Sequence, residues 1–190
     1  MDPKQVGYRV GQIHPTVIKE KAKMRLSKIY LDMDGVLSDF EREYKEFNGI
    51  SCEEVWRDRD RKQFSELWQR FVEARRFEWL PKFSGHDELL EYVRSLGVPV
   101  EILSSSGTGE WHDTVREQKT AWLRRHHIEF PVNVVPGKRL KGDFATPTSL
   151  LIDDTEKCID IFRERGGLAI LHQNVVDTVR ELELIISDCN

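Results

Sequence analysis

Apolar residues follow two spacings that alternate along most of the chain. Runs of consecutive apolar residues predict buried strands at 28–32, 98–103, 132–135, 149–152 and 168–171. Elsewhere apolar residues return every three or four positions, which predicts helices at 38–48, 86–96, 113–127, 156–165 and 175–186. Because the strands are apolar throughout, we expect a parallel sheet covered by helices on both faces. The pattern therefore predicts an α/β fold with a doubly wound, Rossmann-like parallel sheet.

A purely helical stretch interrupts this alternation after the first strand. Residues 53–76 are dense in charge but carry apolar positions at helical spacing, which predicts one or two amphipathic helices that end before Pro81. Because this stretch separates the first strand from the next, we interpret residues 40–82 as a small inserted helical cap. The core would then consist of residues 28–39 and 83–190.

Charge is spread unevenly and changes the interpretation of the N-terminus. The 190-residue chain has a net charge of −4, yet residues 1–28 hold seven Lys or Arg against two acids. We interpret residues 1–27 as a basic extension. A solvated arm is the simpler hypothesis, and contact with a polyanion is the alternative.

Composition excludes some classes of protein. The chain is 39% hydrophobic, as expected of a globular protein, and no apolar run approaches the ~20 residues of a membrane span. The N-terminus also lacks the apolar centre of a signal peptide. Three distant cysteines favour neither a disulfide framework nor a zinc site, so a reducing cytoplasm is the expected location.

Two carboxylates stand at the end of the first predicted strand. If that strand continues through Asp34, the spacing of two places Asp32 and Asp34 on the same face. Neighbouring carboxylates repel each other and are tolerated when a cation lies between them or one takes a proton. A calcium loop would need further oxygen ligands and a closing Glu, which are absent here.

Polar side chains also follow three later strands. Residues 104–106 are serines whose hydroxyls and backbone N–H groups could hold phosphate oxygens, although a plain Ser/Gly loop is the safer interpretation of these residues alone. Residues 138–141 supply cations, and Asp153 and Asp154 close the fourth strand. Carboxylates with a backbone carbonyl suit Mg²⁺, while helix capping is the simpler role for the last pair. Parallel strands would gather all these groups beyond their carboxyl ends.

The order of these motifs resembles the haloacid dehalogenase-like phosphatase superfamily over nearly the whole chain after residue 27. DMDGVL at 32–37 fits the first motif of that superfamily, ILSSS at 102–106 the second, Lys138 the third and LLIDD at 150–154 the fourth. Within the superfamily, DMDGVLSDFE, RRFEWLPKFSG, KTAW at 119–122 and LLIDD are most similar to 5'(3')-deoxyribonucleotidases. The segment before the last acid pair is longer here, so Lys141 stays an alternative to Lys138.

The resemblance implies a phosphomonoester hydrolase that works through an aspartyl-phosphate. Asp32 would attack phosphorus, and Asp34 would protonate the leaving oxygen and then activate water. Ser104 and Ser105 would bind the phosphoryl oxygens, with Ser104 in place of the commoner Thr. Lys138 would hold Asp32 and the phosphate in position.

The same resemblance implies a magnesium site and a class of substrate. Mg²⁺ would be held by Asp32, the backbone carbonyl of Asp34, and Asp154, with Asp153 nearby or acting through water. The expected substrate is a small phosphorylated molecule, a nucleoside or deoxynucleoside monophosphate.

Aromatic residues of the predicted cap are candidates for contact with a nucleobase. Phe40, Phe77 and Trp79 lie nearest the predicted hinge, although packing the cap is the simpler role for each. Two other enzyme functions stay open, a phosphatase of nucleic-acid 3' ends or of a sugar phosphate. A non-catalytic binding protein on this fold is less expected because each catalytic position keeps its type of side chain. We expect no membrane association, and a homodimer stays open.

Overall fold

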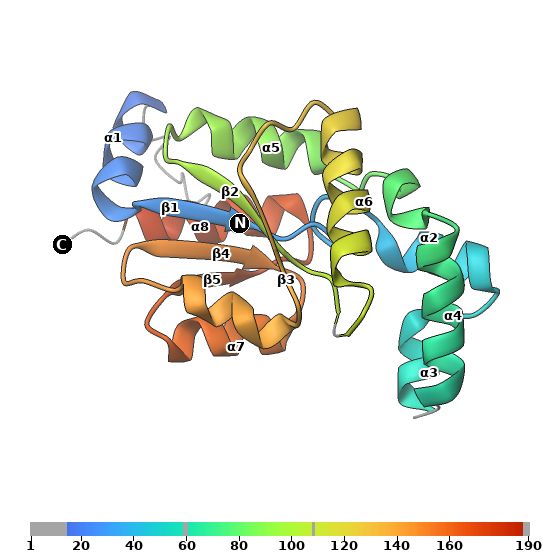
Figure 1. Cartoon of the computed structure of the whole chain (residues 1–190). Coiled ribbons are helices and arrows are strands. Elements are labelled where there is room, and N and C mark those ends of the chain that lie inside the picture. The colour runs from blue at the N-terminus through green and yellow to red at the C-terminus, as the bar shows by residue number, and fades with distance from the viewer. Residues whose placement is uncertain (1–14, 59–60, 108, 188–190) are drawn as a thin grey trace, which may run out of the picture.

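The computed structural model describes residues 15–58, 61–107 and 109–187. Five strands form one parallel sheet in the order β3-β2-β1-β4-β5 (Figure 1). The strands are β1 (Lys28–Leu31), β2 (Val100–Ser105), β3 (Val132–Val135), β4 (Ser149–Asp153) and β5 (Leu168–Leu171). Because the chain starts in the middle strand and winds outward in both directions, the predicted doubly wound α/β fold is confirmed.

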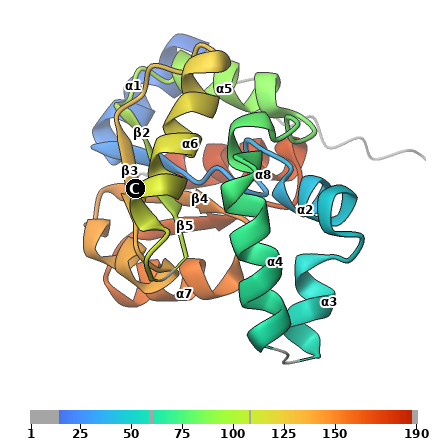
Figure 2. The same ribbon diagram turned by 45° about the vertical axis from the view of Figure 1, so that its right-hand side comes forward.

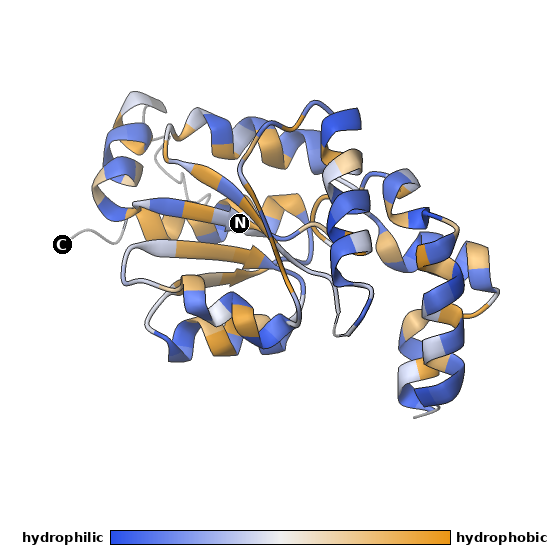
Figure 3. Cartoon of the chain, viewed as in Figure 1, coloured by the Kyte–Doolittle hydropathy of each residue, from blue (hydrophilic) through white to orange (hydrophobic). Residues whose placement is uncertain are grey.

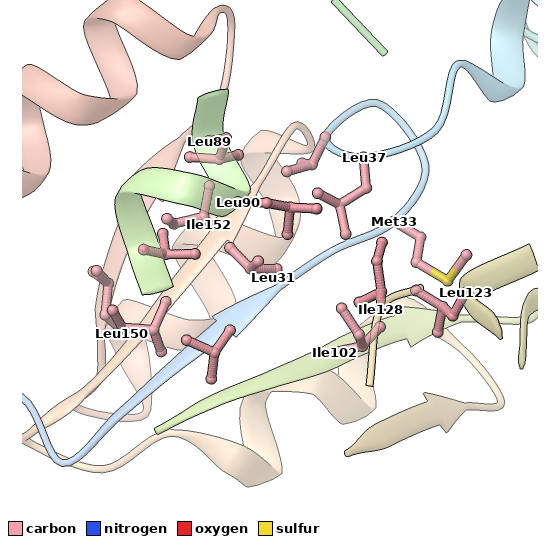
Figure 4. Close-up of a cluster of buried hydrophobic side chains, with 14 of the residues drawn as sticks. Leu31, Met33, Leu37, Leu89, Leu90, Ile102, Leu123, Ile128, Leu150 and Ile152 are labelled. Atoms are coloured by element: carbon pink, nitrogen blue, oxygen red, sulfur yellow. The ribbon is translucent and has the colours of Figure 1, made fainter. Parts of the chain in front are cut away.

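Helices cover the sheet on both faces. They are α1 (Pro15–Arg25), α5 (His86–Ser95), α6 (His112–Arg125), α7 (Glu156–Glu164) and α8 (Val175–Ser187), with a 3₁₀ segment η2 (Lys138–Phe144) before β4. Leu31 joins a cluster that reaches α1, α5, α6 and α8, part of which is drawn in Figure 4. Its neighbour Tyr30 points the other way, into a second cluster with Phe162 of α7. Figure 3 shows apolar residues along the strands, with helices on both faces of the sheet.

The strand register sets the position of the site. Leu31 pairs with Ile102 of β2 on one side and with Ile152 of β4 on the other. The amide N–H of Asp32 then donates to the carbonyl of Ile152 at 3.0 Å. The carboxyl ends of β1, β2 and β4 therefore lie at the same edge of the sheet, and β2 continues to Ser105, past the level of Leu31.

The inserted residues 40–82 form helices at this edge. They are α2 (Phe40–Asn48), α3 (Cys52–Arg57), α4 (Arg61–Glu73) and a 3₁₀ turn η1 (Arg76–Trp79). Figures 1 and 2 show α2, α3 and α4 together beyond the carboxyl ends of the strands. The two linkers to this segment are hydrogen-bonded to each other, from Asp39 N–H to the Pro81 carbonyl at 2.8 Å and from Phe83 N–H to the Leu37 carbonyl at 3.0 Å.

The N-terminus differs from the prediction of a solvated arm. Residues 15–25 form α1, and Ala22 and Leu26 are buried against the main core. Ile18, Ala22 and Leu26 recur every four residues and place an apolar stripe against the body of the protein, while the basic residues lie on the remaining faces. The solvated-arm interpretation is therefore wrong for residues 15–27, and residues 1–14 lie outside the described part of the chain.

Within the part of the chain that the structure describes, no helix has the length and apolar character needed to cross a membrane.

Candidate active site

Three carboxylates meet at this edge of the sheet. Asp32, Asp153 and Asp154 each place one oxygen within 4.8 Å of the others. Asp32 directly follows β1, and Asp153 is the last residue of the neighbouring strand β4, so the parallel pairing of the two strands brings them together. The side chain of Asp34 is directed elsewhere, toward α6, which leaves its backbone carbonyl for the ligand role that the resemblance implies.

The electrostatics of this cluster fit a divalent cation. Asp154 keeps an exposed edge, yet the surrounding protein and then the carboxylates of Asp32 and Asp153 raise its pKa to about 7. Mutual repulsion of this kind is relieved when a cation binds between the oxygens. Carboxylate oxygens are also the donors that Mg²⁺ prefers, so the residues present suit that ion.

Gly35 permits the tight turn that completes the cluster. Its φ of +79° lies in the left-handed region, and a Cβ atom there would come within 2.2 Å of Oδ2 of Asp154. Only a residue without a side chain lets the loop after β1 approach Asp154 this closely.

Lys141 is the buried cation beside the acids. Its Nζ lies 2.8 Å from Oδ2 of Asp32 and 2.6 Å from Oδ2 of Asp153, and the side chain is 1% exposed. The close approach of η2 to α7 supports this burial, since a Cβ on Gly142 would lie 2.7 Å from Cγ2 of Ile161.

Lys138 has a different position from the one expected. Its Nζ donates to Oγ1 of Thr155 at 3.1 Å, at the protein surface. Lys138 and Lys141 are one 3₁₀ turn apart, and the deeper of the two makes the contact with Asp32 that we predicted for Lys138. The alternative that the sequence left open is therefore the one that the geometry favours.

The serines at the end of β2 join the same site. Ser104 is 1% exposed, and its hydroxyl, together with the lysines, holds the carboxylate of Asp32 in its ionised form. Burial alone would raise the pKa of Asp32, but Lys141 and Lys119 outweigh burial and keep it below its usual value. Ser105 lies at the rim, where its hydroxyl accepts from the amide N–H of Gly107 at 3.2 Å.

Lys119 was not among the predicted site residues. It comes from α6, is fully buried, and donates from Nζ to Oδ2 of Asp34 at 2.7 Å and to Oγ of Ser104 at 2.8 Å. A signal for it existed, because Lys119 occupies a core position of α6 between Val115 and Trp122. A lysine on the apolar face of a helix needs a buried partner.

The three aromatic candidates have different surroundings. Phe77 is fully buried, and its ring stacks on Phe40 with 5.6 Å between centroids and 9° between planes. Trp79 is 55% exposed and lies beneath the guanidinium of Arg125, on the outer side of α6. The structure therefore places Phe40 and Phe77 together and Trp79 apart from them.

Trp68 of α4 is the half-buried aromatic next to the serine loop. Its ring contacts Phe77 at 5.5 Å between centroids and approaches Gly107, where a Cβ would lie 3.5 Å from Cζ2 of Trp68. Because Nζ of Lys119 lies 5.3 Å from the centroid of Phe77, this aromatic cluster of Phe40, Trp68 and Phe77 adjoins the charged site.

Comparison with known proteins finds likeness in structure rather than in sequence. No protein-family model and no curated protein matches the chain. A hydrolase from Streptococcus pneumoniae matches with 19% identity and a TM-score of 0.50, over 84% of this chain and 100% of that one. A phosphoserine phosphatase in its apo form matches with 13% identity and a TM-score of 0.50, over 82% and 98%.

A third match names the architecture. A HAD hydrolase of family IA from Entamoeba histolytica has 14% identity and a TM-score of 0.51, over 86% of this chain and 100% of that chain. The chain has the fold of the haloacid dehalogenase-like hydrolases. At these identities the likeness establishes the fold, and the chemistry has to be argued from the site itself.

Proposed function

We propose that the protein is a magnesium-dependent phosphomonoester hydrolase that forms an aspartyl-phosphate on Asp32. The observation that carries this proposal is the setting of that carboxylate. Asp32 is nearly buried yet ionised, in contact with the ammonium of Lys141 and beside two further carboxylates. A nucleophilic carboxylate held in this way is suited to attack a phosphate whose charge is neutralised by lysine and metal.

The proposed reaction has two steps. An oxygen of Asp32 bonds to phosphorus while the ester P–O bond breaks, and Asp34 gives its proton to the departing oxygen. Water, deprotonated by Asp34, then attacks phosphorus, frees the carboxylate of Asp32 and releases inorganic phosphate. Ser104 supports both steps from its place beside Asp32.

A cation at this site would supply positive charge to the phosphoryl oxygens. Asp32, Asp154 and the backbone carbonyl of Asp34 would hold Mg²⁺, with Asp153 shared between the metal site and Lys141. Lys141 is itself placed to neutralise charge on Asp32 and on the phosphate.

For the substrate, we propose a nucleoside or deoxynucleoside monophosphate in the cytoplasm. Support comes from the aromatic cluster of Phe40, Trp68 and Phe77, which borders the charged site from the inserted helices. Phe40 and Trp68 are half-buried, and of the three rings Trp68 is the one that approaches Gly107 of the serine loop, so a base would stack on Trp68 rather than on Phe77 or Trp79. The burial of α1 removes part of the argument for a nucleic-acid substrate, because residues 15–27 belong to the folded body.

Release of inorganic phosphate from a panel of phosphorylated metabolites, with Mg²⁺ and with a chelator, tests the proposal. We expect nucleoside monophosphates to be hydrolysed and the chelator to abolish turnover. Asp32→Asn should reduce turnover to background and leave the folded state intact by circular dichroism. Asp160→Asn on the exposed face of α7 is the matched control and should keep full activity. Activity retained by Asp32→Asn would reject the mechanism.

A further inference from the structure

Lys119 has a set of contacts that the proposed two-step reaction does not yet use. Its ammonium donates to Oδ2 of Asp34, to Oγ of Ser104 and to the carbonyl of Ser105, at 2.7, 2.8 and 2.8 Å. An ammonium has three N–H bonds, so all its donors are occupied by groups of the protein. These three contacts give Lys119 a role in holding the groups of the site in place.

We propose that Lys119 is a positioning residue that fixes the Asp34 carboxyl group relative to Ser104, so that it faces the leaving oxygen. This inference rests on the proposed function, since it concerns the residue that would protonate the leaving group. Asp34 is held from its other side as well, because Ser38 donates to Oδ1 at 3.2 Å. Lys119 and Ser38 together leave the carboxyl group little freedom to rotate.

The position of the ammonium is itself fixed by the packing of α6. One residue before Lys119, Gln118 donates to the carbonyl of Val72 at 2.8 Å, and three residues after it Trp122 donates to the carbonyl of Leu80 at 2.7 Å. Val72 lies in the last turn of α4, and Leu80 directly follows η1, so both acceptors lie where the inserted helices return to the core. This face of α6 is therefore attached to the inserted segment on both sides of Lys119, and Nζ of Lys119 lies 5.3 Å from the centroid of the Phe77 ring.

An electrostatic role for Lys119 alone would not require this arrangement. Lys141 already supplies a buried cation to Asp32 and Asp153 at the floor of the site. Lys119 instead joins α6, β2 and the loop after β1 at a single atom. Preorganisation of this kind contributes most to a step whose geometry is demanding, here the transfer of a proton to the leaving oxygen.

The test compares two substrates of similar shape with different leaving groups. Benzyl phosphate needs a proton on its leaving alkoxide, whereas 4-nitrophenyl phosphate releases a stable phenolate without one. The ratio kcat/KM covers the steps up to departure of the leaving group, so it excludes hydrolysis of the aspartyl-phosphate. Because Lys119 also helps to keep Asp32 ionised, Lys119→Met should lower kcat/KM for both substrates. We expect the loss to be about 30-fold larger for benzyl phosphate than for 4-nitrophenyl phosphate, because general acid catalysis matters for the first substrate alone.

Two further variants make the result decisive. Ser38→Ala removes the second contact of Asp34 without a change in charge, so it should show the same preference at about tenfold. Arg116→Met removes an exposed cation from the same helix and should leave both substrates unchanged. Circular dichroism and thermal unfolding check that each variant is folded.

Distinct outcomes separate this inference from the proposed function. Equal losses on both substrates in folded Lys119→Met, or no loss on either, would overturn the positioning role while wild-type turnover and inactive Asp32→Asn still support the hydrolase. A wild-type protein that hydrolyses neither substrate, or an active Asp32→Asn variant, would overturn the hydrolase and the positioning role with it.

Discussion

The two sides of the site are built in different ways. The floor consists of Asp32, Asp153 and Asp154 with Lys141, and these residues stand at strand ends or in the turn before β4. The opposite side consists of groups that meet across α6 and the inserted helices, with Lys119 at their centre. The floor depends on strand register and the other side on helix packing. We infer that the floor provides phosphoryl transfer and the helical side governs the leaving group and its recognition.

The largest expected effect tests whether the floor depends on Lys141. Lys141→Met should lower kcat/KM by about 10³-fold for every substrate, because it removes the cation that contacts Asp32 and leaves carboxylates to repel each other. Lys138→Met should stay within about threefold, since the Lys138 ammonium contacts Thr155 at the surface. Steady-state kinetics on one aryl phosphate suffice for this pair. A larger loss of kcat/KM in Lys138→Met than in Lys141→Met would assign the role of the third-motif lysine to Lys138.

The helical side should respond in a way that depends on the substrate. Trp68→Ala should raise KM for a nucleoside monophosphate about tenfold, the range expected for loss of one stacked base. It should leave 4-nitrophenyl phosphate nearly unchanged. Trp79→Ala, which removes an exposed ring beneath Arg125, is the matched control and should change neither substrate. An equal loss of kcat/KM on both substrates in Trp68→Ala would indicate that Trp68 packs the site and does not recognise the base.

The smallest expected effect is a pH dependence of stability that belongs to the floor. The pKa of Asp154 is raised to about 7 from an unfolded value of 3.8, so the folded metal-free protein binds more protons than the unfolded chain between these values. The contribution of Asp154 to stability is therefore fully present below pH 4 and is lost as the pH rises toward 7.

Magnesium should reverse this trend, because it binds the ionised carboxylate. We expect saturating Mg²⁺ to raise Tm by about 5 °C at pH 8 and by much less at pH 5, as measured by differential scanning calorimetry. Asp154→Asn should remove most of the pH dependence of that shift. A shift that is the same at both pH values in the wild type would argue against a metal site that includes Asp154.

The same contrast explains how much the sequence could predict. The sheet and the acids at its strand ends were predictable because apolar runs mark buried strands, and the ends of parallel strands meet at one edge. Asp32, Asp153 and Asp154 follow directly from that rule. The choice between Lys138 and Lys141 could not be predicted from that rule, because both lie in one 3₁₀ segment. Only tertiary packing around Gly142 decides which of the two lysines is buried.

The helical side was harder to predict for a physical reason. Lys119 meets Asp34 and Ser104 across long separations in sequence, and no periodic pattern encodes which helix faces which strand end. Trp79 illustrates the same limit, because its short distance along the chain from Phe77 concealed that the two rings lie on different sides of η1. In α1, the dense basic residues conceal the four-residue spacing of Ile18, Ala22 and Leu26.

The paired linkers of the inserted segment have a mechanical consequence. The two passes of the chain are joined by backbone hydrogen bonds, and Ser38, which contacts Asp34, forms a bridge with Lys82 of the returning pass. A ligand that displaces the inserted helices must therefore move both linkers together. Ser38 would pass this movement on to Asp34. Binding of the substrate by the inserted helices would thus be coupled to the position from which Asp34 delivers its proton.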